Sequence, residues 1–435
     1  MKFSLISTSS AARLGIITNV FRLPDFELET PHALLYTRSG TVPHLTYDVL
    51  QMVSKQSMAL HIPVSHLTNI QERIKSSNSN IAKFIGMNEY LTYCSFVDSG
   101  EKRDQSCHEK DRISLWTRFG RKAFTAEEYM RFIEDLKPDL FLVLADGDTN
   151  SQCSKKRNIK SFNNTVKFFE KCTEYFEKSS TLKECQMFAA VEGGYDIKLR
   201  EECSELVGKS PILGVVLDGF HDNSESTMDI TFKDIKPVLE ASLRHIPSDK
   251  IRIIHGCWNP SVILDLVAYG IDLFDSSYPY VITEQGSALI FPNDEISLQK
   301  HISEEMENTG EKLNKPQINV AHPPETDENN CPKRMKLSNE SRYFMSLRNP
   351  SFVADFSPVL RNCTCYTCKH HTKAYIHHLL NVKEMLAHTL LMIHNLHHYL
   401  QFLGAIRKSL SSGTFEKLKN DFQCWAELMS NEAEK

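Results

Sequence analysis

The sequence lacks several features that would assign it to a common class of protein. It contains no run of about 18 consecutive apolar residues, so we expect no transmembrane segment. The amino-terminal stretch MKFSLISTSSAARLG has too short an apolar run for a secretory signal peptide. It contains neither a G-x-G-x-x-G motif nor a phosphate-binding P-loop, which argues against a nucleotide-binding sheet. We therefore expect a cytoplasmic protein in a reducing environment.

A surplus of positive charge is also missing. The 50 Lys and Arg residues are outnumbered by 55 Asp and Glu residues, which gives a formal net charge of −5. Phosphate neutralisation supplies most of the affinity of proteins that hold nucleic acid alone, and such proteins usually carry a basic surplus. This composition excludes an obvious stand-alone nucleic-acid binder, but it does not exclude a local basic patch.

From residue 139 onward, apolar runs of strand length alternate with helical patterns. The chain of 435 residues is long enough for one large barrel or for two to three domains. Near-continuous apolar strands that alternate with helices indicate a parallel sheet covered on both faces. The spacing predicts an α/β fold, a (β/α)8 TIM barrel. The runs are LFLVLAD (140–146), MFAAVEGG (187–194), ILGVVLDG (212–219), IRIIHGC (251–257) and GIDLFDSS (270–277).

Four carboxylates stand where these strands are expected to end: Asp146, Glu192, Asp218 and Asp275. In a barrel such positions ring the carboxy-terminal mouth, where active sites are built. The alternative is that each residue caps the following helix.

The chain divides into three expected parts. Residues 1–296 form the TIM-barrel body. Residues 297–345 are polar and poor in aromatics, which predicts a disordered insertion. Residues 346–435 form a zinc-binding subdomain with closing helices.

The third part contains a cluster of cysteines, CTCYTC. Cys363, Cys365 and Cys368 offer three soft ligands, and a tetrahedral site needs one more, for which Zn²⁺ fits best. The candidates for the fourth ligand are His370, His371, His377, His378, His388 and His394. The first two are too close to the last cysteine to fold back. An apolar stripe predicts a helix over 385–404, and His394 borders that stripe.

The same region resembles a known family. The stretch DFSPVLRNCTCYTCKHHTKAYIHHLLNVKEMLAHTLLMIHNLHHYLQFL (355–403) is similar to the zinc-binding subdomain of tRNA-guanine transglycosylases. LLYTRSGTVPHLT (34–46) and RIIHGCWNPSVILDLVAYGIDLFD (252–275) resemble barrel segments of that family. The resemblance implies one structural Zn²⁺ on Cys363, Cys365, Cys368 and His394. It also implies exchange of the wobble guanine (position 34) of tRNAs with GUN anticodons for queuine, which belongs to queuosine biosynthesis.

The family reaction is a double displacement at a ribose, with one aspartate as nucleophile and another as acid/base. The resemblance places the nucleophile position at Asp275 and puts Tyr93 where the acid/base aspartate stands. Val281 and Glu284 replace two arginines that grip the tRNA. The family's base-reading Q-G-G is EGG here, with Glu192, and Asp148 replaces a cysteine. A DSG sequence at 98–100 lacks the family's following GFQ, and we take it as coincidental.

These departures predict a non-catalytic accessory subunit with a vestigial Asp275. It would form a heterodimer with a catalytic member of the family and contact tRNA through that complex. The resemblance further implies a cytoplasmic protein that docks peripherally on the mitochondrial outer membrane. One alternative is a self-sufficient transglycosylase that uses Asp275 as nucleophile and Asp98 as acid/base. A second alternative is a zinc-stabilised RNA-binding scaffold without a role in base exchange.

Overall fold

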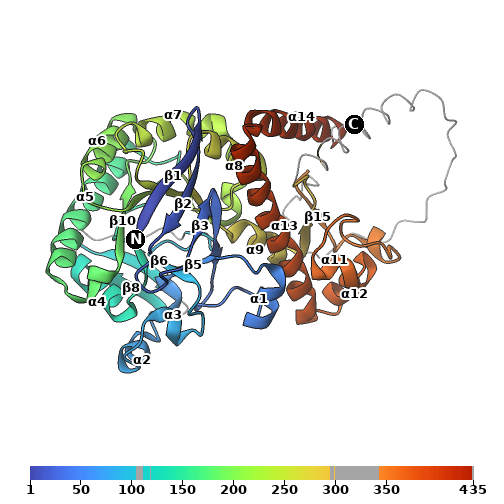
Figure 1. The fold of residues 1–435 in the computed structure, drawn as a ribbon, viewed down its shortest axis with the longest axis horizontal. Coiled ribbons are helices and arrows are strands. Elements are labelled where there is room, and N and C mark those ends of the chain that lie inside the picture. The colour runs from blue at the N-terminus through green and yellow to red at the C-terminus, as the bar shows by residue number, and fades with distance from the viewer. Residues whose placement is uncertain (104–110, 118, 294–297, 299–341, 434–435) are drawn as a thin grey trace, which may run out of the picture.

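Eight short parallel strands close into a barrel in the computed structural model, which describes residues 1–103, 111–117, 119–293, 298 and 342–433 (Figure 1). Strand β13 pairs with β4 and closes the ring, so the predicted TIM-type barrel is confirmed. The five apolar runs form β9 to β13, as predicted. In chain order the strands are β4 (His32–Tyr36), β5 (Ala59–Pro63), β6 (Leu91–Ser95), β9 (Leu140–Leu142), β10 (Gln186–Val191), β11 (Gly214–Leu217), β12 (Ile251–Ile254) and β13 (Leu273–Asp275).

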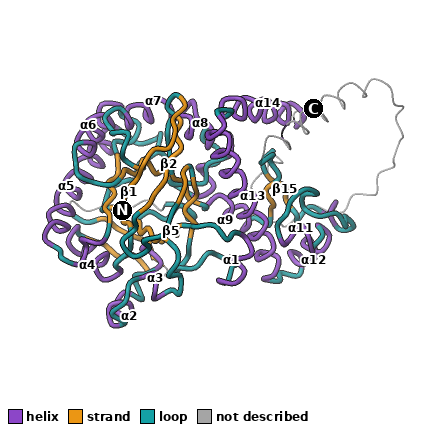
Figure 2. Tube along the Cα trace, in the orientation of Figure 1, coloured by secondary structure: helices purple, strands orange, loops and turns teal. Residues whose placement is uncertain are grey.

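Helices surround the barrel strands (Figure 2). Five of them, α3, α4, α5, α6 and α8, begin at a side chain that accepts a backbone N–H group, as in the capping box of Thr125 and Glu128 at α4. The helices are α1 (Tyr47–Val53), α2 (Gln71–Ser76), α3 (Ile81–Phe84), α4 (Ala126–Leu136), α5 (Lys155–Lys178), α6 (Ile197–Gly208), α7 (Phe232–Leu243), α8 (Pro260–Ala268) and α9 (Ser277–Glu284). The 3-10 turns are η1 (Val64–His66), η2 (Thr181–Glu184) and η3 (Ser224–Thr227).

Two of the three sheets outside the barrel precede β9 in the chain. Strands β1 (Lys2–Ser9), β2 (Ala12–Thr18) and β3 (Leu28–Thr30) form an antiparallel sheet, whose Phe3 and Ile17 pack in one cluster with residues of the barrel interior. Arg13 of β2 anchors this sheet through Asp272, with 2.7 Å between Arg13 Nε and Asp272 Oδ1. Between β6 and α4, strands β7 (Ile113–Thr117) and β8 (Gly120–Phe124) form a hairpin. The sequence pattern did not predict either sheet.

A two-stranded clasp precedes the carboxy-terminal unit. Strand β14 (Ser287–Leu289) pairs antiparallel with β15 (Phe344–Ser346), and Ile290 N lies 2.9 Å from Tyr343 O. The insertion predicted at 297–345 falls almost wholly outside the described residues, apart from 298 and 342–345. The predicted domain boundaries therefore stay predictions.

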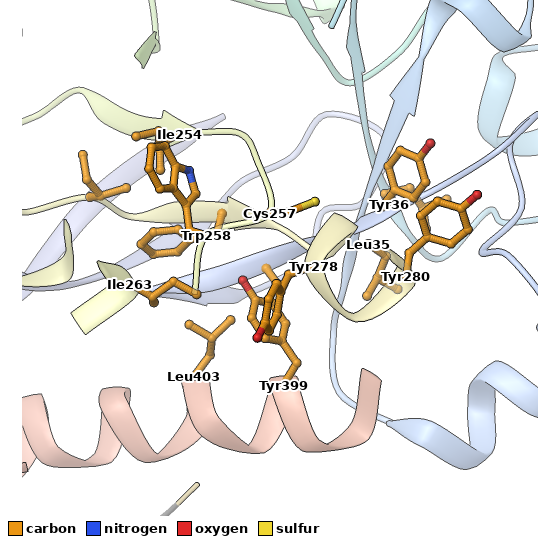
Figure 3. Packing of buried hydrophobic residues seen from close by; sticks show 14 of the residues in the cluster. Leu35, Tyr36, Ile254, Cys257, Trp258, Ile263, Tyr278, Tyr280, Tyr399 and Leu403 are labelled. Atoms are coloured by element: carbon orange, nitrogen blue, oxygen red, sulfur yellow. The ribbon is translucent and has the colours of Figure 1, made fainter. Parts of the chain in front are cut away.

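The carboxy-terminal helices are α11 (Tyr366–His370), α12 (Lys373–Asn381), α13 (Met385–Ser412) and α14 (Phe415–Ala433), preceded by the 3-10 turn η4 (Pro350–Phe352). The helix predicted over 385–404 is confirmed and extends to Ser412, where Gly413 ends it with a left-handed φ of 73°. Tyr399 and Leu403 of α13 point toward Tyr278 and Ile263 of the barrel (Figure 3). Within the described ranges, no helix combines the length and apolarity needed to cross a bilayer.

Candidate metal centre and the mouth of the barrel

The three cysteines and His394 converge on one point. Cys365 stands at the amino-terminal end of α11, where its Sγ accepts the backbone N–H of Cys368 at 3.3 Å. This contact folds the chain so that both thiols face the same side. The ligand atoms of Cys363, Cys365, Cys368 and His394 all lie within 4.8 Å of one another. Cys365, Cys368 and His394 are buried, and Cys363 is partly exposed.

The distances within this cluster suit a tetrahedral ion. The Nδ1 atom of His394 lies 3.7 Å from Cys363 Sγ, 3.6 Å from Cys365 Sγ and 3.3 Å from Cys368 Sγ. Zinc–sulfur bonds of about 2.3 Å and zinc–nitrogen bonds of about 2.0 Å at a tetrahedral angle place sulfur and nitrogen roughly 3.5 Å apart. The cluster can therefore hold a metal, and its donors and spacing are consistent with zinc.

A second contact orients His394. Its Nε2 lies 2.8 Å from the carbonyl oxygen of Leu289 in β14. Nε2 donates to that carbonyl, so Nδ1 carries no proton and its lone pair is directed at the cysteines. Other candidate histidines have different partners: His377 Nδ1 lies 2.8 Å from Leu347 O, and His388 stacks on His44.

Helix α13 connects this cluster to the barrel. Asn395, next to His394, donates to Thr283 Oγ1 at 2.9 Å and Ser287 O at 3.0 Å, and accepts from Leu289 N at 2.8 Å. One turn further, the hydroxyl of Tyr399 donates to the backbone oxygen of Asp275 at 3.2 Å. The cluster is thus linked by buried hydrogen bonds to the strand end that carries Asp275.

Asp275 lies fully buried at the mouth. Its Oδ2 accepts from Gly256 N at 2.8 Å, and its Oδ1 accepts from Ser277 N at 2.7 Å. Burial raises the pKa of Asp275 to about 6, although hydrogen bonds from Ser277 and Gly256 oppose the shift. Because Ser277 begins α9, the helix-cap alternative is correct in part for this residue.

Tyr93 lies in an aromatic stack inside the barrel. Its ring centroid is 5.4 Å from that of His61 and 5.6 Å from that of His255, and the two imidazoles are 4.7 Å apart. All three side chains are buried. Burial lowers the pKa of His61 well below its ordinary value and lowers that of His255 to about 3, so both rings are neutral. The stack fills the barrel interior with uncharged rings.

Asp146 and Asp218 are held by arginines rather than by helix ends. Arg157 Nη1 donates to Asp146 Oδ2 at 3.1 Å, and Asn164 donates to the same oxygen at 2.8 Å. Arg103, from the loop after β6, donates to Asp218 Oδ1 at 3.2 Å and to the carbonyl of Gly147. The helices that follow these strands take other residues as caps, so for these two carboxylates the helix-cap alternative is wrong.

Glu192 is buried without a hydrogen-bond partner for either carboxylate oxygen among the described residues. A Cβ at Gly147 would overlap the carboxylates of both Asp218 and Glu192, which shows how closely the backbone covers them. Burial raises the pKa of Glu192 well above its ordinary value; Asp218 adds to the shift, and Arg200 and Arg103 oppose it. The side chain is therefore a neutral carboxylic acid over a wide range of pH.

Replacing Glu192 by Gln should stabilise the protein more at pH 8 than at pH 5. The raised pKa means that the folded state favours the protonated acid, so this residue's contribution to stability is full below about 4.5 and declines as pH rises toward the folded-state pKa. Glutamine has nearly the same shape and does not ionise. The melting temperatures of Glu192→Gln and the parent chain at both pH values test this expectation.

The matched control is Glu205→Gln, because Glu205 is exposed and pairs with Lys209 at 2.7 Å. This control should give no difference that grows with pH. An equal difference for Glu192→Gln at pH 5 and pH 8 would show that the acid has a partner or solvent access.

The remaining predicted positions lie on the rim or just below it. Glu284 accepts from His44 Nε2 at 2.5 Å, and this hydrogen bond lowers the pKa of Glu284. Val281 is buried. Asp98 accepts from Tyr36 Oη at 2.8 Å and lies 2.6 Å from His66 Nε2. Burial works to raise the pKa of Asp98, but these two contacts outweigh it and lower the pKa.

Sequence reasoning missed the partners of these residues. Arg103 was noted only within EKRD, the residues that replace the expected GFQ after the DSG. The buried His61 and His255 carried no sequence signal, because a lone histidine within an apolar run is common. Asn395 directly follows His394 in the sequence, but this adjacency alone predicts no contact.

Comparison with known proteins identifies a family over nearly the whole chain. The sequence profile described as queuine tRNA-ribosyltransferase matches residues 8–425. The chain is 36% identical over 424 residues to a Xenopus tropicalis protein named queuine tRNA-ribosyltransferase accessory subunit 2, covering 96% of this chain and 98% of that protein. Proteins with the same name from Aedes aegypti and Homo sapiens are 33% and 32% identical. The match with the Aedes aegypti protein covers 97% of this chain and 92% of that protein, and the match with the Homo sapiens protein covers 96% and 98%.

Proposed function

Because this chain belongs to the queuine tRNA-ribosyltransferase family, we propose that it is the non-catalytic subunit of a heterodimer. The catalytic subunit of that complex exchanges guanine for queuine at the wobble position of tRNAs with GUN anticodons. The relatives' name, accessory subunit 2, supports this assignment.

The observation that carries the proposal is Tyr93 in its aromatic stack with His61 and His255. Double displacement at a ribose needs a nucleophilic carboxylate and a second group that transfers protons. Burial raises the pKa of the Tyr93 phenol well above its ordinary value, so at neutral pH it cannot serve as a base. Asp275 already accepts two backbone N–H groups.

A position that the family resemblance assigns to tRNA binding is altered as well. Where the family resemblance expects an arginine, Glu284 offers a carboxylate that a hydrogen bond from His44 keeps ionised. A carboxylate near a phosphate repels it, and a paired imidazole does not replace a guanidinium fork. We therefore assign the main contact with the reacting anticodon loop to the catalytic subunit.

Cys363, Cys365, Cys368 and His394 would hold Zn²⁺ in a structural role. Four protein ligands close the tetrahedron and leave no position for a reacting water. The ion would supply folding energy, because the short helices α11 and α12 contain few residues that could build a core of their own. The hydrogen bonds of His394 to Leu289 and of Asn395 to Thr283 would then hold β14 and α9 in place beside the metal cluster.

The pairing surface that we propose is the exposed apolar patch between α12 and α13. We call it the α12–α13 patch, and it consists of Tyr375, Val382, Met385 and Leu386. Met385 is 85% exposed and Val382 is 52% exposed. Several exposed apolar residues within a short stretch of sequence are typical of a protein interface. The metal cluster would keep this patch in place.

Base exchange tests the proposal. Labelled guanine should enter a tRNA with a GUN anticodon when this chain and a catalytic subunit of the family are mixed, and not with this chain alone. Asp275→Asn should leave the activity of the mixture within about threefold of the parent, whereas the same change at the nucleophilic aspartate of the catalytic subunit should abolish it. Exchange by this chain alone would overturn the proposal.

A further inference from the structure

We propose that His66, Asp98 and Glu101 form a second metal site, which binds a six-coordinate divalent ion such as Mn²⁺ at the mouth of the barrel. The ion would join the turn after β5 to the connection after β6. The site shares no residue with the cysteine cluster, and the inference does not depend on the proposed function.

The three side chains stand after two neighbouring barrel strands. His66 is the last residue of η1, which directly follows β5, and Asp98 and Glu101 belong to the connection after β6. Strands β5 and β6 pair in parallel, so both connections leave the barrel at the same end. One ligand atom of each residue lies within 4.8 Å of the other two. In an octahedral site with bonds of about 2.1 Å, neighbouring donors are roughly 3.0 Å apart and opposite donors roughly 4.2 Å apart. The spacing therefore suits a single ion.

Asp98 is held in a fixed orientation. Its Oδ1 accepts from Tyr36 Oη at 2.8 Å and from Gly100 N at 3.1 Å, and its backbone oxygen accepts from Asn223 Nδ2 at 3.0 Å. These contacts leave Oδ2 facing His66, whose Nε2 is 2.6 Å away. A metal ion would take the place of the proton that this nitrogen and oxygen share, and would move them apart by a few tenths of an ångström.

Glu101 is available to a cation at little cost. Its present partner is Arg38, and the two side chains are 50% and 43% exposed. An ion pair as exposed as this one contributes little to stability. Arg38 also donates to Tyr280 Oη at 2.7 Å, so it keeps a partner when the carboxylate turns to an ion.

A cavity beside the three residues supplies further oxygen atoms. Asp98 and Glu101 line this cavity of about 120 Å³ together with Ser65 and Asn223. Ser65 is 6% exposed and Asn223 is 1% exposed, yet Ser65 Oγ and Asn223 Oδ1 have no hydrogen-bond partner among the described residues. A buried polar atom without a partner indicates a bound ligand or ordered water. Hydroxyl and amide oxygens bind divalent cations directly or through water, so they can complete the coordination.

The charge of the cavity favours a cation. Its described lining holds two more acidic than basic side chains: Asp98, Glu101, Asp148 and Asp218 against Lys102 and Arg103. Arg103 already pairs with Asp218 at 3.2 Å. An imidazole suits a first-row transition ion, whereas carboxylates, other oxygens and water suit Mn²⁺, Mg²⁺ and Ca²⁺. The mixed set of donors therefore points to an ion of the Mn²⁺ type.

The first experiment titrates the purified, zinc-loaded chain with Mn²⁺ and measures free Mn²⁺ by electron paramagnetic resonance. The parent should bind one Mn²⁺ per chain while its zinc content stays constant. Loss of a group that only supports a metal ligand lowers affinity by about 10- to 100-fold, and loss of a ligand should cost at least as much. Glu101→Gln and Asp98→Asn should therefore each weaken Mn²⁺ binding at least about tenfold.

The matched control is Glu284→Gln. Glu284 also accepts from an imidazole, that of His44 at 2.5 Å, but no third metal-binding group joins them in the described part of the chain. This variant should bind Mn²⁺ like the parent. Equal affinity of the parent, Glu101→Gln and Asp98→Asn would overturn the inference. So would the absence of Mn²⁺ binding by the parent, or the loss of one zinc for each Mn²⁺ bound.

A second experiment needs no variant. Anomalous diffraction from crystals of the parent grown with Mn²⁺ should place the ion between His66, Asp98 and Glu101, and an ion found only elsewhere would overturn the inference. Neither experiment uses tRNA or the catalytic subunit. Failure of base exchange therefore leaves this inference standing, and failure to bind Mn²⁺ leaves the proposed function standing.

Discussion

Replacing Cys365 by Ala is expected to release the metal and unfold the helices around it. Cys365 Sγ is one of four converging ligand atoms, and it also accepts the N–H that begins α11. Apparent zinc-binding energies of about 10–16 kcal/mol in small folded units exceed the stability of most domains, so loss of one ligand removes most of the local folding energy. Zinc content by mass spectrometry should fall below stoichiometric, and the region after residue 342 should become sensitive to protease.

The consequence for function should be equally large. An unfolded subdomain cannot present the α12–α13 patch, so Cys365→Ala should fail to pair with the catalytic subunit, and base exchange should fall by roughly two orders of magnitude or more. Cys424→Ala is the matched control, because Cys424 is an exposed cysteine of α14 outside the cluster. Full zinc content and normal pairing in Cys365→Ala would show that the ligand assignment is wrong.

Replacing Met385 by Asp should break pairing while the subunit stays folded. Met385 is 85% exposed in the isolated chain, so a charge there meets water and leaves the melting temperature and zinc content unchanged. In the complex the same charge would be buried against an apolar surface. Loss of a central anchor weakens association by roughly 30- to 1000-fold. Analytical ultracentrifugation with the catalytic subunit measures this change directly.

Activity provides a second readout for Met385→Asp. Exchange should be lost at low subunit concentration and recover as the concentration of the variant rises, because only association is affected. Ile6→Asp serves as the control, since Ile6 is 53% exposed on β1, far in sequence from the patch. Unchanged affinity for Met385→Asp would place the pairing surface elsewhere on the molecule.

The barrel was predictable where the strands were purely apolar. Strands β9 to β13 are near-continuous apolar runs, four of which end in an acid, and this pattern identified them. Strands β5 and β6 contain His61 and Tyr93, which point into the barrel and stack on each other. A search for apolar runs treats a histidine or tyrosine as the end of a run. It does not anticipate polar rings that pack against one another inside a barrel. These strands were therefore reached only through the family resemblance or not at all.

The candidate site divides in the same way. The three cysteines were evident from their spacing, because local sequence brings them together. The choice of His394 over its neighbours came from the family resemblance. The contacts at the mouth join distant segments: Arg103 meets Asp218 across 115 positions of the chain. That Glu192 has no partner could be learned only from its surroundings, since the same residue at a strand end elsewhere would be solvated or paired.

The clasp of β14 and β15 has a consequence for how this protein can vary. Ile290 and Tyr343 are hydrogen-bonded neighbours, so two positions far apart in the sequence meet at one place in the fold. Closing a longer flexible loop between fixed ends adds only about 0.6 kcal/mol for each doubling of its length. Insertions, deletions or a fused domain could therefore accumulate between these strands while His394 keeps its contact with Leu289. The clasp therefore lets the length of the connection between β14 and β15 change during evolution without changing the geometry of the metal centre.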